Sequence, residues 1–303
     1  MTPVINIQEL SKVYGQKQAL TELNLQVQSG DFFAFIGPNG AGKSTTIRIL
    51  LGLLNKTSGR AQLFGQDVGP QKSQLLQKIA YVPAEVNYYS KFKVNEIFKF
   101  AASIRSQLSP ELLNNLAQDF DLDLNKRVKD LSLGNRKKIA IVLALAQQAD
   151  LYILDEPTSG LDPLMQQIFW QKIQEQHRQG ATIFVSSHIL SEVQKYCQQV
   201  AIIRQGRIIA QGPMQDLLIN QSKQLMIKGS LDPQDLLGIS HLKTEPGMCS
   251  FLYQGSMTDL LAYLHRHQDQ IVDLTIQQPD LESLFIHYYA EKAGEADGLL
   301  ERS

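Results

Sequence analysis

The stretch GPNGAGKST at residues 37–45 decides how this 303-residue chain folds. It follows the apolar run DFFAFI and opens the segment GKSTTIRILLGLL, which has the composition of a helix. Its glycines allow backbone N–H groups to close around phosphate oxygens, and the start of the helix adds about half a positive charge. The order strand, loop, helix therefore predicts a phosphate-binding loop, with Lys43 at the β- and γ-phosphates and the Ser44 hydroxyl at Mg²⁺. The loop comprises Gly37, Pro38, Asn39, Gly40, Ala41, Gly42, Lys43, Ser44 and Thr45.

Two adjacent carboxylates end another apolar run, LYILDEP at residues 151–157. Burying two neighbouring negative charges is costly unless something offsets them. Asp155 is expected to hold Mg²⁺ through its water shell, and Glu156 to orient or deprotonate an attacking water. The alternative is an acidic turn that caps the following helix. His188, after the run ATIFVSS, is either a structural histidine or part of the same site, and Tyr14 is either a packing aromatic or a surface on which a purine stacks.

A second stretch, DLSLGNRKK at residues 130–138, also has the composition of an anion-binding site. It places a serine and a glycine ahead of an apolar helix, which is predicted over residues 136–148. Arg136, Lys137 and Lys138 stand at the start of that helix. We expect these three cations to form a solvated charged run rather than to act in catalysis.

Taken in order, GPNGAGKST, LSLGN, LYILDEPTSGLD and His188 resemble the motifs of an ATP-binding cassette (ABC) ATPase, over about residues 4–212. The resemblance implies that LSLGN is the family signature, which contacts the γ-phosphate of ATP bound to the other subunit of a head-to-tail dimer. The partner subunit is then a second copy of this chain or a second ABC subunit, and the two phosphate-binding elements contact different nucleotides. The implied ATP contacts are Tyr14, residues 37–45, Ser132, Gly134 and Asp162; the implied catalytic residues are Lys43, Glu156 and His188; the implied Mg²⁺ contacts are Ser44 and Asp155.

The sequence departs from the family pattern in two places. Leu133 and Asn135 replace a glycine and a glutamine of the usual signature Leu-Ser-Gly-Gly-Gln but leave its contacting serine and second glycine, so we expect a working signature. Ala84, in IAYVPAEVNYY, stands where the family has a glutamine that touches Mg²⁺ or the water and links the site to the membrane partner. We expect hydrolysis to persist with slower or different gating.

Composition narrows the function classes. The formal net charge is −1, with 29 basic and 30 acidic side chains, so no general nucleic-acid binding is expected. The N-terminal residues lack the pattern of a signal peptide, and no apolar run reaches the roughly 20 residues of a membrane span. We therefore expect a cytoplasmic protein, peripheral on the inner face of the cell membrane, whose separate integral membrane subunit supplies the spans. Cys197 and Cys249 are expected to be reduced and buried.

The predicted fold class is α/β: a P-loop NTPase (RecA-like) core with an antiparallel β subdomain and a helical insertion, plus a small C-terminal α+β domain of ferredoxin-like type. Runs such as LYILDE and ATIFVSS lack alternation, which predicts central strands buried on both faces. The expected domains are residues 1–220, with the insertion at about 86–148, then 221–291 and a loose tail at 292–303. In the second domain, helices are predicted at DPQDLLG, MTDLLAYLHRH and LESLFIHYYAEK.

The leading interpretation is the ATP-hydrolysing subunit of a membrane exporter, driven by closure of the ATP-bound dimer. The alternative is a soluble ABC-type ATPase that acts on ribosomes or DNA. A GTPase is disfavoured because both Asn-Lys pairs lack the aspartate of the guanine-reading motif. The aromatic stretch at residues 88–92 either docks a helix of the membrane subunit or packs within the insertion, and the C-terminal domain either resembles an exporter extension or only supports dimerisation.

Overall fold

The computed structural model describes residues 3–69, 73–105, 108–219, 223–277 and 281. The chain divides into two compact units, Met1–Gln211 and Gly212–Ser303. Across the described residues, no helix is long and apolar enough to span a bilayer.

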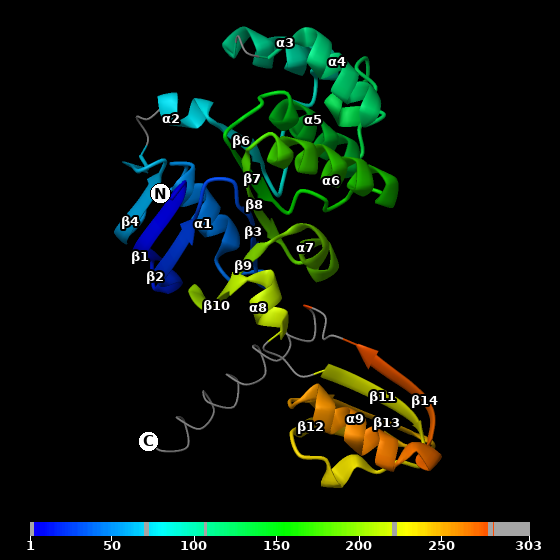
Figure 1. Cartoon of the computed structure of the whole chain (residues 1–303). Helices are drawn as coiled ribbons and strands as arrows, with labels where there is room; N and C mark the ends of the chain where they lie inside the picture. The colour runs from blue at the N-terminus through cyan, green and yellow to red at the C-terminus, as the bar shows by residue number, and fades with distance from the viewer. Residues whose placement is uncertain (1–2, 70–72, 106–107, 220–222, 278–280, 282–303) are drawn as a thin grey trace. The chain divides into compact units, whose positions relative to one another are not determined.

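A six-stranded sheet with the order β10-β9-β3-β8-β7-β6 forms the centre of the first unit (Figure 1). The strands from β9 to β6 run parallel. Every residue of β3, β7 and β8 is buried, which confirms that the runs without alternation are central strands. The similar run in β10 is only partly buried because this strand lies at the edge of the sheet. The strands are β3 (Phe32–Ile36), β6 (Ile79–Val82), β7 (Leu151–Asp155), β8 (Thr182–Ser187), β9 (Gln199–Arg204) and β10 (Arg207–Pro213).

A second, antiparallel sheet with the order β2-β1-β4-β5 confirms the predicted β subdomain. Helix α1 (Lys43–Leu50) packs between the two sheets, where Ile47 and Ile49 share one core with Ile5 and Phe35 (Figure 1). The sequence analysis did not identify β4, because only Ala61 and Leu63 of its run SGRAQL are buried. The strands are β1 (Ile5–Tyr14), β2 (Lys17–Val27), β4 (Ser58–Leu63) and β5 (Gln66–Asp67).

Three helices of the first unit begin at side-chain caps. Ser109, Ser132 and Asp162 accept hydrogen bonds from the backbone N–H groups three residues later. The cap at Ser132 explains why α5 begins at Leu133, three residues before its predicted start. The helices are α2 (Ser73–Gln77), α3 (Val94–Ile104), α4 (Pro110–Asp119), α5 (Leu133–Leu145), α6 (Pro163–Arg178) and α7 (Leu190–Tyr196), with a 3-10 turn η1 (Val128–Asp130).

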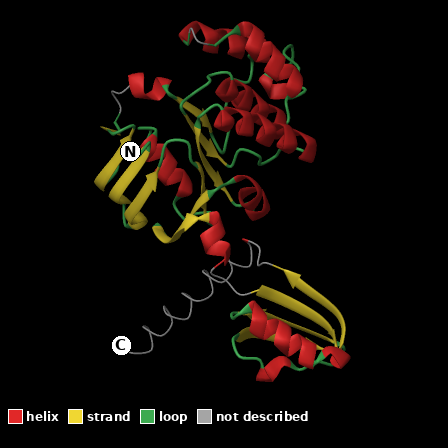
Figure 2. Ribbon diagram, in the orientation of Figure 1, coloured by secondary structure: helices red, strands yellow, loops and turns green. Residues whose placement is uncertain are grey.

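The second unit contains an antiparallel sheet with the order β12-β13-β11-β14. Helix α9 lies across one face of it, where Leu260 and Leu264 join the core (Figure 2). The predicted helix at DPQDLLG is wrong: it is the short 3-10 turn η2, which ends before Gly238 at φ +85°. The predicted final helix lies outside the described residues, except for Leu281. The elements are α8 (Met214–Ile219), β11 (Lys223–Gly229), η2 (Pro233–Asp235), β12 (Ile239–Glu245), β13 (Met248–Tyr253), α9 (Met257–Arg266), η3 (Gln268–Gln270) and β14 (Ile271–Gln277).

Candidate nucleotide-binding and catalytic site

A cavity of about 570 Å³ lies where the loop between β3 and α1 meets the ends of neighbouring strands. Most of the predicted phosphate loop lines it, together with Tyr14 and Glu156, which are far away in sequence. The parallel sheet explains this meeting, because β3 and β7 both end at this edge. The described residues that line the cavity are Tyr14, Lys17, Gln18, Ala19, Pro38, Asn39, Gly40, Gly42, Lys43, Ser44, Thr45, Ala84, Glu156 and Gln205.

Two glycines hold the phosphate loop close to the strands behind it. A Cβ atom at Gly37 would lie 2.4 Å from the carbonyl oxygen of Ile203 on β9, closer than real Cβ contacts. Gly42 caps α1 at φ +116°, in a region that favours glycine, and a Cβ there would lie 2.7 Å from Leu20 on β2. A side chain at Gly37 would therefore force the loop and β9 apart, because the atom that it meets belongs to the backbone.

The ammonium of Lys43 lies buried at the floor of the cavity. It donates to the carbonyl oxygen of Gly37 at 2.5 Å and more weakly to that of Pro38 at 3.4 Å. It also lies 3.4 Å from Oε1 of Glu156. Loop carbonyls and a carboxylate therefore fix a positive charge in the position where an anionic group of a ligand would meet it.

Glu156 stands directly after β7 in a conformation that is uncommon for a residue with a side chain, at φ +48°. Its Oε2 accepts a hydrogen bond from the backbone N–H of His188 and lies 2.6 Å from Nδ1 of the same residue. Its Oε1 is buried and accepts no hydrogen bond within the described structure. Oε1 therefore faces the Lys43 ammonium at 3.4 Å without a hydrogen bond, and a carboxylate held in this way at the edge of the cavity can act as a proton acceptor.

Asp155, the last residue of β7, is buried beside Glu156. Its Oδ1 accepts a hydrogen bond of 2.5 Å from the hydroxyl of Ser186 on β8. The parallel register of the two strands, which pairs these two residues, fixes the contact. The predicted carboxylates thus lie together, one buried in the sheet and one at the cavity.

Tyr14 ends β1 at the opposite side of the cavity and remains largely exposed. The ammonium of Lys12 lies 5.0 Å from the centre of its ring. An exposed ring on the cavity wall is the arrangement needed for stacking a purine, rather than for packing in a core. Gln18 and Ala19 of β2 and Gln205 after β9 also line the cavity, and they were not predicted because no sequence motif marks these positions.

The signature stretch does not line this cavity within one copy of the chain, although all of its residues are described. The hydroxyl of Ser132 caps α5 by accepting from the N–H of Asn135 at 3.2 Å. Gly134 lies so close to the loop before α6 that a Cβ atom there would be 2.4 Å from the carbonyl oxygen of Gly160. Asp162 caps α6 at the end of that loop. The signature and the loop at residues 159–162 therefore form one packed unit.

The predicted solvated charged run at residues 136–138 is wrong for two of its three members. Lys137 is only 2% exposed, and Lys138 is also buried. The first turn of α5 is partly exposed, but every residue from Lys137 to Val142 is buried, so these two lysines lie inside the protein. The ammonium of Lys137 donates to the carbonyl oxygens of Pro83 and Ala84 at 2.7 and 2.8 Å.

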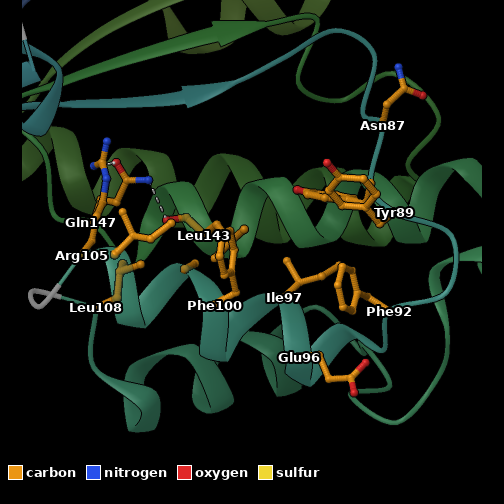
Figure 3. Close-up of a pocket in the computed structure, with 13 residues that line it drawn as sticks. Asn87, Tyr89, Phe92, Glu96, Ile97, Phe100, Arg105, Leu108, Leu143 and Gln147 are labelled. Carbon is orange, nitrogen blue, oxygen red and sulfur yellow. Dashed lines mark hydrogen bonds between the residues drawn. The ribbon is translucent and has the colours of Figure 1, made fainter.

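A second cavity of about 620 Å³ is an apolar groove between α3, α5 and the segment before α3 (Figure 3). Phe92, Ile97 and Phe100 point into it, with the ring of Tyr89 opposite and the guanidinium of Arg105 at one end (Figure 3). Tyr89 is 80% exposed and Phe100 is 67% exposed. The groove therefore presents an unusual amount of uncovered apolar surface.

Comparison with known proteins agrees with this geometry. The family model described as ABC transporter matches residues 20–159. The bacitracin transport ATP-binding protein BcrA of Bacillus licheniformis is 34% identical over 231 residues, which cover 74% of this chain and 74% of that protein. The Nod factor export ATP-binding protein I of Cupriavidus metallidurans is 32% identical over 277 residues, or 88% of this chain and 91% of that protein.

A solved structure of the ATP-binding subunit of an ABC transporter has the same fold, with a TM-score of 0.65 and 31% identity over 71% of this chain and 91% of that one. By sequence, fold and site, this chain belongs to the ATP-binding subunits of ABC transporters and is an ATPase of that family.

Proposed function

We propose that this chain powers a bacterial exporter: binding of MgATP closes a dimer of cassettes, and hydrolysis with product release reopens it. The observation that carries the proposal is the position of Glu156, at the cavity edge between Lys43 at 3.4 Å and His188 at 2.6 Å. Relatives named for bacitracin transport and Nod factor export support the exporter assignment. ATP is the substrate of the reaction, and the transported molecule is selected by the membrane subunit.

In the proposed reaction, Glu156 takes the proton of the attacking water on Oε1, the oxygen that accepts no hydrogen bond within the described structure. His188 orients the carboxylate through its contact with Oε2 and faces the γ-phosphate from the other side. Lys43 binds the β- and γ-phosphates and stabilises the charge that develops on them. Tyr14 stacks on adenine, and the loop at residues 37–45 wraps the phosphates with its N–H groups.

The residues present fit Mg²⁺, which prefers hard oxygen ligands and phosphate oxygens. The hydroxyl of Ser44 lines the cavity, and the carboxylate of Asp155 ends the strand beside it. We assign these two residues to the ion, Asp155 acting through the water shell. A Mg²⁺ ion held there would supply positive charge that offsets the negative charge of the phosphates.

Ser132, Gly134 and Asp162 are assigned to the nucleotide of a second subunit. All three are at or beside helix N-termini, which attract anions, yet none lines the cavity of its own chain. A head-to-tail dimer would place each signature over the cavity of the other copy. The partner is a second copy of this chain or another ABC subunit.

The apolar groove is assigned to a helix of the separate integral membrane subunit. Its exposed aromatic residues fit an amphipathic helix laid into a hydrophobic groove. The chain would then be cytoplasmic and peripheral on the inner face of the cell membrane. The cassette would span residues 1–220, with the insertion that forms the groove at about 86–148.

We also assign residues 221–291 to an accessory domain of ferredoxin-like type, followed by a tail at 292–303. Two features support this type: the strand order β14-β11-β13-β12 with all neighbouring pairs antiparallel, and helix α9, which connects β13 to β14 along the chain. The first helix of that fold is reduced to the turn η2.

The test combines hydrolysis with recovery of the partner. The purified chain should hydrolyse ATP only with Mg²⁺, and tagged protein should recover a polytopic membrane protein from detergent-solubilised native membranes. Replacing Phe100 with aspartate should abolish that recovery while leaving hydrolysis by the isolated chain intact. Leu53, which is equally exposed at 67% but lies outside the groove, provides the matched control Leu53→Asp. Recovery of ribosomal or DNA-repair proteins instead would favour the soluble alternative.

A further inference from the structure

Lys137 makes contacts that neither the family resemblance nor the proposed reaction explains. Its ammonium is buried and donates to the carbonyl oxygens of Pro83 at 2.7 Å and Ala84 at 2.8 Å, with that of Asp155 at 3.5 Å. Burial lowers the pKa of Lys137 to about 8, and the nearby carboxylates of Asp155 and Glu156 oppose this shift. A buried cation is costly unless it is fully hydrogen-bonded, and three carbonyls meet the three donors of this ammonium.

Two of the three carbonyls that Lys137 contacts belong to the segment that connects the two cavities. Ala84 lines the nucleotide cavity, whereas Asn87 and Tyr88, only a few residues later, line the apolar groove. Asp155 belongs to β7, directly before the proposed base. Lys137 itself belongs to α5, the helix that begins at the signature serine. One side chain thus joins the signature helix, the carboxylate strand and the segment that leads to the groove.

Ala84 lines the nucleotide cavity, and its side chain offers no polar atom there. The side chain of Ala84 therefore cannot form a hydrogen bond with the site. The backbone carbonyls of Pro83 and Ala84 are instead held by Lys137 of α5.

We propose that Lys137 is a positioning residue that clamps the Pro83–Ala84 backbone to the end of β7, so that the signature helix and the segment between the two cavities move as one unit. The proposal rests on the proposed function, because it assigns Lys137 an effect on turnover. It acts through the backbone that it holds and touches neither ATP nor water. Lys138 is the natural contrast, because it is the next residue of the same helix and also buried, yet no contact with that backbone is present in the described structure.

The test compares Lys137→Met with Lys138→Met in the full chain, since both changes remove a buried ammonium while keeping an unbranched stem. Nucleotide affinity is measured with a fluorescent ATP analogue and Mg²⁺, kcat and KM by phosphate release, and backbone mobility of residues 83–89 by hydrogen–deuterium exchange. For Lys137→Met we expect kcat to fall about tenfold or more, because charge-assisted hydrogen bonds are lost, while nucleotide affinity stays within about twofold. Hydrogen–deuterium exchange at residues 83–89 should rise in Lys137→Met. Lys138→Met should change neither kcat nor this exchange.

Lys137→Gln provides a second variant, since its amide can donate to the same carbonyls without a charge. It should recover part of the lost kcat and protect residues 83–89 more than methionine does. A kcat of Lys137→Met within about twofold of the unmodified chain, or an equal loss in Lys138→Met, would overturn the inference and leave the proposed function standing. Absence of MgATP hydrolysis by the unmodified chain would overturn the proposed function, and the inference with it.

Discussion

Replacing Gly134 with alanine separates two physical effects that have opposite signs. In an exposed helix, alanine is favoured over glycine by about 1 kcal/mol, so helix propensity alone predicts a more stable protein. In this structure, however, the new Cβ would lie 2.4 Å from the carbonyl oxygen of Gly160. That atom belongs to the backbone of the loop before α6 and cannot rotate away as a side chain would.

The size of the displacement follows from that distance. Restoring a contact of 3.0 Å from 2.4 Å requires the two backbones to separate by about 0.6 Å, and an ordinary contact of 3.4 Å requires about 1.0 Å. Both the signature and the loop that ends at Asp162 would shift by that amount relative to one another. Because a misplacement of about 1 Å can cost about 100-fold in rate, we expect kcat to fall about 10- to 100-fold. ATP binding by the isolated chain should stay within about twofold, since Gly134 does not line its cavity.

The assay is ATP hydrolysis by phosphate release across a range of ATP concentrations, alongside binding of a fluorescent ATP analogue. Gly69→Ala is the matched control, because a Cβ atom there meets no atom of the described residues within 4 Å and the residue lies outside the site. It should leave kcat and affinity unchanged. Turnover of Gly134→Ala within about twofold of the unmodified chain would refute the reasoning from the Gly160 contact.

Three further changes follow from the same geometry. Lys43→Ala removes the buried ammonium that Gly37 holds and should weaken MgATP affinity about tenfold or more in isothermal titration; unchanged affinity would contradict its place at the phosphates. Tyr14→Ala should weaken the binding of ATP by about 0.5–1.5 kcal/mol and leave the binding of inorganic triphosphate unchanged; an equal loss for both ligands would exclude stacking. In the second unit, the hydroxyl of Tyr263 lowers the pKa of the Asp235 carboxyl, so this contact stabilises the fold above about pH 4 and is lost as the pH falls below it. Tyr263→Phe should therefore reduce the hydrogen-exchange protection of α9 at neutral pH and have a smaller effect as the pH falls below about 4; a pH-independent loss would contradict the linkage.

Much of the nucleotide cavity could be predicted from sequence, because motif chemistry and strand order agree. The phosphate loop needs a strand before it and a helix after it, and both are present. The carboxylates at the end of β7 reach the same edge because parallel strands end together. Tyr14 was ambiguous by sequence, and its exposed ring on the cavity wall favours the stacking that we propose.

Lys137 could not be predicted in the same way. A lysine within three successive cations gives no pattern that distinguishes a buried ammonium from a solvated one, and charged runs are usually solvated. Its environment depends on the burial of α5 from Lys137 to Val142 and on two carbonyls from a segment more than fifty residues earlier in the chain. The close approach of Gly134 to Gly160 is likewise a tertiary contact, which the spacing of the signature does not encode.

The central claim is that two subunits complete each other's ATP sites. The two subunits are either two copies of this chain or this chain and a related ABC subunit. Glu156→Gln tests it most directly, because the amide keeps the shape of the side chain at the cavity but cannot accept the proton of water. The account predicts that this variant binds MgATP, hydrolyses it very slowly and accumulates as a dimer in size-exclusion chromatography with light scattering, whereas without nucleotide it remains a monomer. A variant that stays monomeric with saturating MgATP, both alone and beside its membrane partner, would contradict the shared-site account.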